Sequence, residues 1–201
     1  MTHPAPPESL RERKKVRTRQ ALAEAAVALF GEHGFDETPL DELLGSVEVS
    51  RRTFFRYYRS KEDVALTAVK ELWSVFLEVL DETPRNGPLR DVFRDALLAA
   101  LARMDEDWHR RLPTTVRLTA GSPALEGHSL QHCSEVQAEI RRRLGRPDSM
   151  ELRLLIEFCV AAWRSAVDEW LPGCAPGELA DHVRRAFAAM EPGLHLEAEG
   201  A

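Results

Sequence analysis

The amino-acid sequence predicts an all-α fold of about nine helices, in which an N-terminal three-helix module precedes a larger helical region. Two observations support this fold class. Apolar residues recur every three or four positions in each ordered stretch, with no alternating β-strand pattern. Residues that favour helix starts and ends separate these stretches. At 201 residues, 44% of them hydrophobic and 30% charged, the chain is long enough to bury a core.

The first helix is expected to follow a basic arm. Residues 1–14 begin with a Pro-rich stretch and end in Lys and Arg, so we expect them to be disordered. Helical spacing begins at Arg17, and one apolar face holds Leu22, Ala25, Ala26, Leu29 and Phe30. Gly34 favours a helix end, which predicts that this helix stops near His33.

The next three helices carry clear start signals. Thr38 is a candidate N-cap for the second helix, with Pro39 at the first helical position and acidic residues in the first turn, where the helix dipole favours negative charge. After a short connection at 47–49, Ser50 caps the third helix. Ser60 caps a fourth, which is expected to run unbroken through Leu80.

Helical spacing continues after a Pro- and Gly-containing linker at 83–88. The predicted helices cover residues 89–105, 123–144, 149–171 and 176–190. A further segment at 108–119 is expected to be broken by Pro113.

Positive charge is concentrated near the N-terminus. The whole chain has a formal net charge of -6, yet residues 1–61 contain eleven basic and nine acidic residues, and residues 62–201 contain 16 basic and 24 acidic ones. A polyanion-binding module on an acidic body would give this asymmetry, and so would ordinary variation in surface charge.

The third helix carries residues suited to DNA. At 100° per residue, Arg51, Arg52, Phe55 and Arg56 form one arc, while Phe54 and Tyr58 fall on the other side with Thr53 and Tyr57. The arginine fork matches guanine O6 and N7, an aromatic ring can touch a thymine methyl group, and a tyrosine hydroxyl or lysine ammonium can bind phosphate. A merely solvated charged face is the alternative, and the capped helix, short turn and basic arm before this helix favour DNA binding.

Residues 15–22, 28–38 and 49–63, the last containing Ser-Arg-Arg-Thr-Phe-Phe-Arg-Tyr-Tyr, resemble the TetR family of bacterial transcriptional regulators. The resemblance implies a DNA-binding helix-turn-helix domain at 15–62, an effector-binding and dimerisation domain at 63–191, and a flexible tail at 192–201. It places Phe54 and Tyr58 in the core. It also places these residues where family members contact DNA: Thr38, Ser50, Arg51, Arg52, Thr53, Phe55, Tyr57 and Lys61. Glu48 stands where the family often has Gly, so any left-handed conformation there would be strained.

The same resemblance implies a double-stranded DNA operator, a homodimer formed through the two C-terminal helices, and a small-molecule effector. The candidate interface comprises Leu152, Leu155, Phe158, Cys159, Trp163, Val167, Val183 and Phe187, of which about half are expected to pack the chain's own core. Candidate effector-binding residues are Trp73, Phe76, Phe93, Leu97, Trp108, Arg117, His132 and Trp163, with Leu101, Met104 and His128 as further members. Alternatively, the apolar residues belong to the hydrophobic core and the polar ones lie at the surface, without a role in effector binding.

Residues 116–128 are similar to a stretch in the branch of this family that senses acyl-CoA-like ligands. That similarity implies an aliphatic chain inserted among helices, with its anionic head held by arginines.

Other functions find less support. The cysteines Cys133, Cys159 and Cys174 are widely spaced, which indicates neither a disulfide framework nor a metal site, and no cofactor is expected. No apolar run is long enough for a membrane span, so we expect a cytoplasmic protein without a membrane partner. Enzyme motifs are missing, so an enzyme is not expected. The sequence therefore predicts a repressor that binds a palindromic operator as a dimer and is released by a small molecule. A ligand-independent DNA-binding protein and, less favoured, a helical enzyme are the alternatives.

Overall fold

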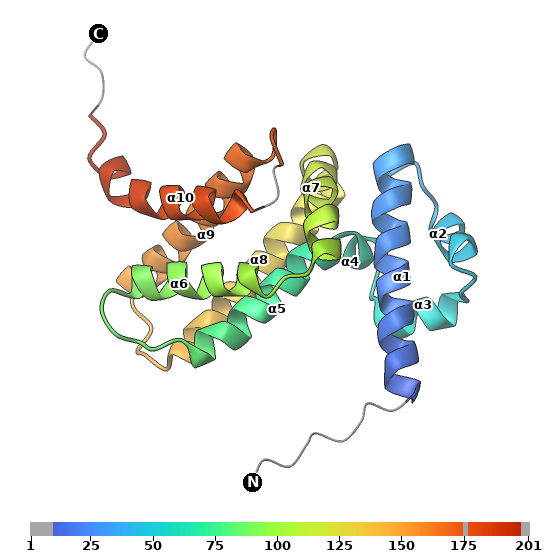
Figure 1. Cartoon of the computed structure of the whole chain (residues 1–201), viewed down its shortest axis with the longest axis horizontal. Coiled ribbons are helices and arrows are strands. Elements are labelled where there is room, and N and C mark those ends of the chain that lie inside the picture. The colour runs from blue at the N-terminus through green and yellow to red at the C-terminus, as the bar shows by residue number, and fades with distance from the viewer. Residues whose placement is uncertain (1–9, 175–176, 198–201) are drawn as a thin grey trace. The chain divides into compact units, whose positions relative to one another are not determined.

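A computed structural model describes residues 10–174 and 177–197, and within these residues the chain forms ten helices (Figure 1). The first five are α1 (Leu10–His33), α2 (Leu40–Ser46), α3 (Arg51–Tyr57), α4 (Lys61–Ala65) and α5 (Thr67–Glu82). The other five are α6 (Leu89–Ala102), α7 (Glu106–Gly121), α8 (Pro123–Leu144), α9 (Met150–Trp170) and α10 (Leu179–Gly193). The all-α prediction is confirmed, with one helix more than the approximate number expected.

The chain divides into two compact units. The first contains the residues up to Ala68 together with Thr114–Ser129, and the second contains Val69–Pro113 and the residues from Leu130 onward. Helices α5, α7 and α8 contribute residues to both units. Among the described residues, none of the helices combines the length and apolar character needed to cross a lipid bilayer.

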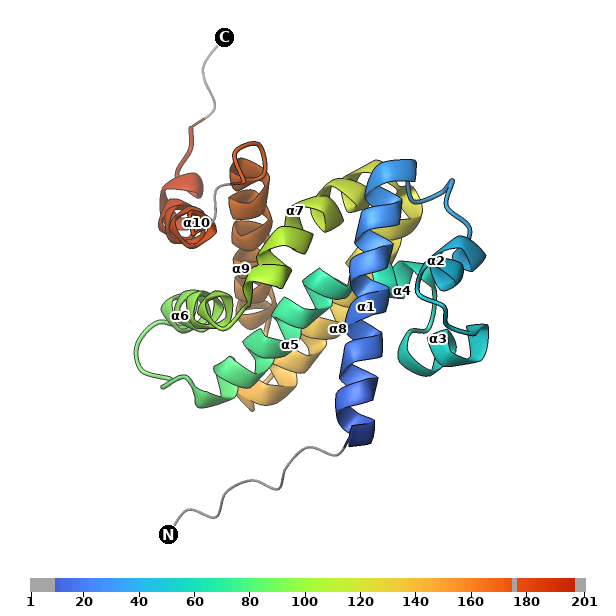
Figure 2. The ribbon, with the colours of Figure 1, turned by 45° about the vertical axis from the view of Figure 1, so that its right-hand side comes forward.

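The first unit has its own hydrophobic core. Figures 1 and 2 show α2 and α3 along the same side of α1. The largest fully buried side chains in this core are Leu22, Phe30, Leu43, Phe54, Leu66 and Leu125. Phe30 and Phe35 meet edge to face with 5.2 Å between ring centroids, which fixes the end of α1 against the following turn.

Helix α1 begins earlier than predicted. Residues 10–14 belong to α1, so the expectation that they are disordered is wrong, while residues 1–9 of the expected arm lie outside the described residues. Lys and Arg are good helix formers and no Pro or Gly separates them from Arg17, so the helix extends through them. The C-terminal end agrees with the prediction, because α1 ends at His33 and Gly34 adopts a φ of 90°.

Two predictions about helix continuity are wrong. The helix expected from Ser60 through Leu80 is interrupted at Leu66, where the buried Thr67 hydroxyl donates to the Val64 carbonyl at 2.7 Å and the chain turns. Conversely, α7 continues through Pro113. Trp108 and Leu112 are almost fully buried on this helix, and their packing offsets the backbone hydrogen bond that proline removes.

The second unit has a core of aromatic and aliphatic side chains. Helices α6, α9 and α10 contact one another pairwise. Trp73 on α5 meets Trp163 on α9 at a centroid distance of 6.3 Å, and Phe76 on α5 meets Phe93 on α6 at 6.0 Å. These contacts join α5 to the helices on which the C-terminal surface is built.

Candidate nucleic-acid interface

The turn between α2 and α3 sets the orientation of α3 relative to α2. The Glu48 amide donates to the Gly45 carbonyl at 3.2 Å, and the Val49 amide donates to the Leu44 carbonyl at 3.1 Å. This pair of bonds is the Schellman motif, whose C′ residue must be left-handed and is usually glycine. Glu48 occupies that position with a φ of 53°, so the strain expected from its sequence is present.

Helix α3 is fixed at its start and along its inner side. The Ser50 side chain accepts a hydrogen bond from the Thr53 amide at 3.2 Å, as an N-cap does. Phe54 and Tyr58 are buried, as predicted, and the Tyr58 hydroxyl donates to the Arg19 carbonyl on α1 at 2.9 Å. These contacts cap the start of α3 and anchor its inner side on α1.

The outer face of α3 combines positive charge with aromatic surface. Arg51, Arg52 and Arg56 are exposed, and Phe55 is 53% exposed. Within the described part of the chain, Arg52 makes no hydrogen bond or ion pair. Arg56 lies 4.8 Å from the centroid of the half-buried Tyr57 ring and donates to its hydroxyl at 2.9 Å. Exposed guanidinium groups and the exposed Phe55 ring are suited to contact with the base edges and phosphates of a DNA groove.

Arg51 forms an ion pair that was not expected from the sequence. Its Nε donates to Oδ1 of Asp41 on α2 at 2.8 Å, and its Nη2 donates to Oδ2 at 2.6 Å. Hydrogen bonding to Arg51 lowers the pKa of Asp41, and the same contact raises the pKa of Arg51. Asp41 is one of the acidic residues in the first turn of the second helix, for which the sequence indicated only an interaction with the helix dipole. Opposite charges ten residues apart, across a tight turn, were the signal that could have revealed the pair.

Two of the predicted DNA contacts make hydrogen bonds within the module. Thr38 is fully buried, and its hydroxyl donates to the Gly34 carbonyl at 2.7 Å, so Pro39 rather than Thr38 precedes α2 as the cap residue. The Lys61 ammonium donates to the Phe35 carbonyl and lies 4.1 Å from the centroid of the Phe35 ring, and its partial burial lowers the pKa of Lys61. In this structure the Thr38 hydroxyl thus faces the module's interior, and the Lys61 ammonium is bound to the Phe35 backbone.

The remaining six predicted contacts gather on one short segment. Ser50, Arg51, Arg52 and Phe55 are exposed, while Thr53 and Tyr57 are half-buried. All six belong to α3 or to its N-cap residue.

The apolar residues among the predicted effector contacts are buried in this structure. Trp73, Phe76, Phe93 and Leu97 are buried, and with Ile140, Cys159, Val160 and Phe187 they line a cavity of about 10 Å³. That volume holds at most one water molecule. Trp108 and Trp163 are also buried, Arg117 is exposed, and Nδ1 of the half-buried His132 lies 4.0 Å from Glu135. The apolar candidates therefore take the core role that the sequence left open.

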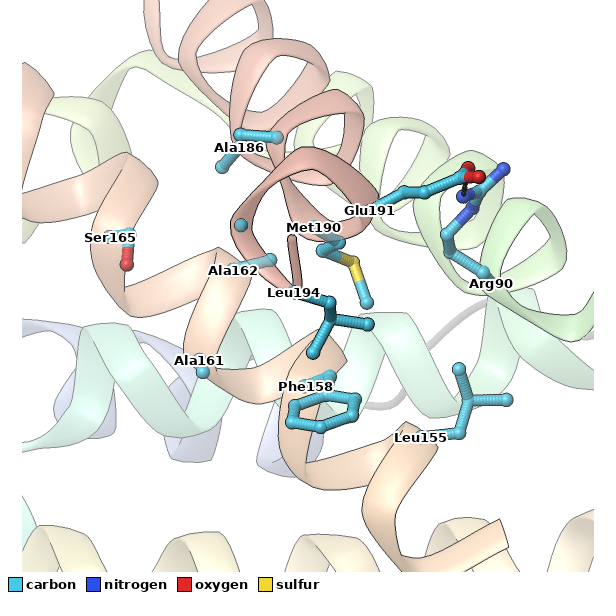
Figure 3. Close-up of a pocket in the computed structure, with 12 residues that line it drawn as sticks. Arg90, Leu155, Phe158, Ala161, Ala162, Ser165, Ala186, Met190, Glu191 and Leu194 are labelled. Carbon is cyan, nitrogen blue, oxygen red and sulfur yellow. Dashed lines mark ion pairs between the residues drawn. The ribbon is translucent and has the colours of Figure 1, made fainter. Parts of the chain in front are cut away.

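The C-terminal helices expose an apolar groove of about 480 Å³ (Figure 3). Phe158 and Leu155 of α9 line it together with Met190 of α10 and Leu194. Arg90 and Glu191 form an ion pair of 3.5 Å at its edge. Of the predicted interface residues, only Leu155 and Phe158 line this groove. The others are buried in the chain's own core, which is more than the half that was expected there: Leu152, Cys159, Trp163, Val167, Val183 and Phe187.

The cysteines do not form a reactive centre. Burial raises the pKa of the Cys159 thiol to about 12, and burial also raises the pKa of Cys133. No cluster of His, Cys, Asp and Glu suited to a metal ion occurs among the residues that the structure describes.

A capped α3 that is anchored on α1, follows a tight turn after α2 and exposes arginine and aromatic side chains defines a helix-turn-helix DNA-binding module. Comparison with known families gives the particular assignment. Residues 22–68 match the family of bacterial regulatory proteins called the tetR family, and residues 87–195 match the MftR C-terminal domain. The chain belongs to the TetR family of transcriptional regulators.

Individual relatives agree with this assignment. The transcriptional regulator TcmR of Streptomyces glaucescens is 29% identical over 80% of this chain and 76% of its own length. A Mycobacterium tuberculosis protein named for regulation of mycofactocin biosynthesis, MftR, is 30% identical over 83% of this chain and 86% of its own. The transcriptional repressor AcnR of Corynebacterium diphtheriae is 25% identical over 86% of this chain and 89% of its own.

Solved structures support the same fold. A transcriptional regulator from Aquifex aeolicus superposes with a TM-score of 0.56 at 15% identity, covering 87% of this chain and 98% of its own. A TetR-like regulator from a Rhodococcus species gives a TM-score of 0.54 at 21% identity, covering 96% and 100% of the two chains. At these identities the likeness concerns the fold alone.

Proposed function

We propose that this protein is a cytoplasmic repressor that binds a palindromic operator as a homodimer and leaves the DNA when a small molecule binds its helical domain. The observation that carries the proposal is the outer face of α3, where Arg51, Arg52 and Phe55 are exposed on a helix anchored by Phe54 and Tyr58. Such a face reads about one half-site in the major groove. Repression is the action named for the relative AcnR.

The dimer follows from the need to read two half-sites. A two-fold dimer with its reading helices one DNA turn apart gains enough contacts for a useful affinity. The groove between α9 and α10 supports this assembly, because Phe158 is 40% exposed and Leu194 is 67% exposed beside it. Apolar side chains gathered in one groove are suited to burial against a second copy.

The effector is proposed to be hydrophobic, and an acyl-CoA-like molecule is the class to test first. The apolar side chains that surround the small cavity, including Trp73 and Phe93, would have to move apart to admit it. A ligand that binds only the conformation in which these side chains have moved apart would lower the population of the DNA-binding conformation. Long-chain palmitoyl-CoA is the probe, and coenzyme A without an acyl chain is the matched control.

The decisive experiment is selection of bound sequences from random duplex DNA. The expected result is a palindromic consensus whose half-sites lie about one helical turn apart. Palmitoyl-CoA should then release the selected DNA, while coenzyme A should not. Failure to enrich any sequence at low salt would contradict the DNA-binding role, and enrichment without release would contradict the effector class only.

A further inference from the structure

The ion pair between Asp41 and Arg51 leaves part of the arginine available for DNA. A guanidinium has five N–H groups. Asp41 occupies one on Nε and one on Nη2, so both hydrogens of Nη1 and one of Nη2 remain. These form a second edge, which matches the O6 and N7 acceptors of guanine as well as the first edge does.

The surroundings favour this use of the second edge. The side chain of Arg51 is 63% exposed and that of Asp41 is 66% exposed, so the pair lies at the surface rather than in the core. Arg51 is the first residue of α3, and base contacts in helix-turn-helix modules come from the N-terminal part of the reading helix. Arg52, by contrast, has no partner within the described residues and is free to reach phosphate.

We infer that Asp41 is a specificity-determining positioning residue, an inference that rests on the proposed function. Its carboxylate binds one edge of the Arg51 guanidinium, so that the other edge of this guanidinium reads a guanine and does not bind a phosphate. Two effects follow. The bidentate contact fixes the plane of the guanidinium, which lowers the entropy lost on binding a base. The carboxylate also cancels the charge of Arg51, which weakens the attraction to phosphates of any sequence.

The test compares Asp41→Asn with Glu42→Gln. Both variants remove one negative charge from the first turn of α2, but Glu42 is hydrogen-bonded to His33 at 3.0 Å and not to an arginine. In Asp41→Asn, the ratio of operator to random-duplex affinity should fall about tenfold, the loss of one oriented base contact. The slope of log affinity against log salt for random DNA should steepen by about 0.9, as one more cation meets phosphate. In Glu42→Gln, the ratio and the slope should stay at wild-type values.

Two further variants separate positioning from a general effect of charge. Arg51→Lys keeps the positive charge, but a lysine ammonium cannot donate two parallel hydrogen bonds to the Asp41 carboxylate. The ratio of operator to random-duplex affinity should therefore fall as it does in Asp41→Asn. In an Arg51→Gln background, Asp41→Asn should no longer change the ratio. A second selection with Asp41→Asn should also lose a guanine preference at one position of each half-site.

The outcomes distinguish this inference from the proposed function. If wild-type protein binds no duplex, the DNA-binding role itself fails. If wild type binds its operator but Asp41→Asn keeps the specificity ratio, or loses it equally in the Arg51→Gln background, Asp41 does not act through Arg51 and the inference is overturned. Melting temperatures of all variants should stay close to wild type, because both side chains are exposed.

Discussion

Arg111 on α7 donates from Nη2 to Oε2 of Glu71 on α5 at 2.9 Å, and only 9% of Arg111 is exposed. Its Nε and Nη1 are buried and make no hydrogen bond within the described residues. Glu71 is thus the one carboxylate that balances a nearly buried guanidinium in the described chain. Buried charges tolerate the loss of a partner poorly, because the remaining ion is desolvated and uncompensated.

The first prediction concerns the ion pair between Arg111 and Glu71. Glu71→Gln should lower the free energy of unfolding by about 2 kcal/mol, less than for a fully buried pair because the Glu71 side chain is 30% exposed. The double variant Arg111→Met with Glu71→Leu should recover most of the loss, because apolar side chains carry no desolvation cost. Urea unfolding followed by circular dichroism measures both. Equal destabilisation of the single and double variants would contradict a charge-balancing role for Glu71.

The second prediction concerns the strained turn. Glu48 holds a left-handed conformation at the C′ position of α2, with a φ of 53°. Glu48→Gly should raise the free energy of unfolding by about 0.5–1 kcal/mol, because glycine adopts a left-handed conformation without steric cost. The greater conformational freedom of glycine in the unfolded chain offsets part of this stabilisation. Glu48→Ala is the matched control, because it removes the charge and keeps the strain. If the alanine variant is as stable as the glycine variant, charge rather than backbone conformation sets the effect.

Local signals in the sequence predicted the elements that depend on few residues. Gly34 ends α1 and Ser50 caps α3 because each acts on its own turn. Phe54 and Tyr58 are buried, as the family resemblance implied, and helical periodicity had placed them opposite the arginines. Residues whose role depends on contacts distant in sequence were assigned less well. The Lys61 ammonium is held by Phe35, 26 residues earlier, a contact that no periodicity reveals.

The C-terminal surface shows the same limit. Helix α9 is apolar over much of its circumference, so its sequence alone does not distinguish the side that meets α6 and α10 from the side that faces outward. Cys159 and Trp163 consequently looked like interface residues but are core, whereas Leu155 and Phe158 line the groove. The packing of α5, α6 and α10 against α9 separates the two sets.

The third prediction concerns that groove. Phe158→Glu places a charge where the proposed dimer buries an aromatic ring, so it should convert the dimer to a monomer at micromolar concentration. Its fold should survive, because Phe158 is 40% exposed in the single chain. Leu130→Glu is the control, since Leu130 on α8 is 52% exposed and lies outside the groove. Light scattering after size-exclusion chromatography reports the mass. A Phe158→Glu dimer as stable as wild type would place the interface elsewhere.

The fourth prediction separates phosphate contacts from base contacts on α3. Arg52 is exposed and makes no hydrogen bond or ion pair with the rest of the described chain, so Arg52→Ala should leave the melting temperature unchanged. As a phosphate ligand, Arg52 should contribute similarly to operator and random DNA, and its loss should reduce the salt slope by about 1 per reading helix. Arg146→Ala, at an exposed residue between α8 and α9, is the matched control and should bind like wild type. Fluorescence anisotropy at several salt concentrations measures both affinities. If Arg52→Ala weakens only operator binding, Arg52 contacts a base rather than a phosphate. The roles assigned to Arg51 and Arg52 must then be exchanged.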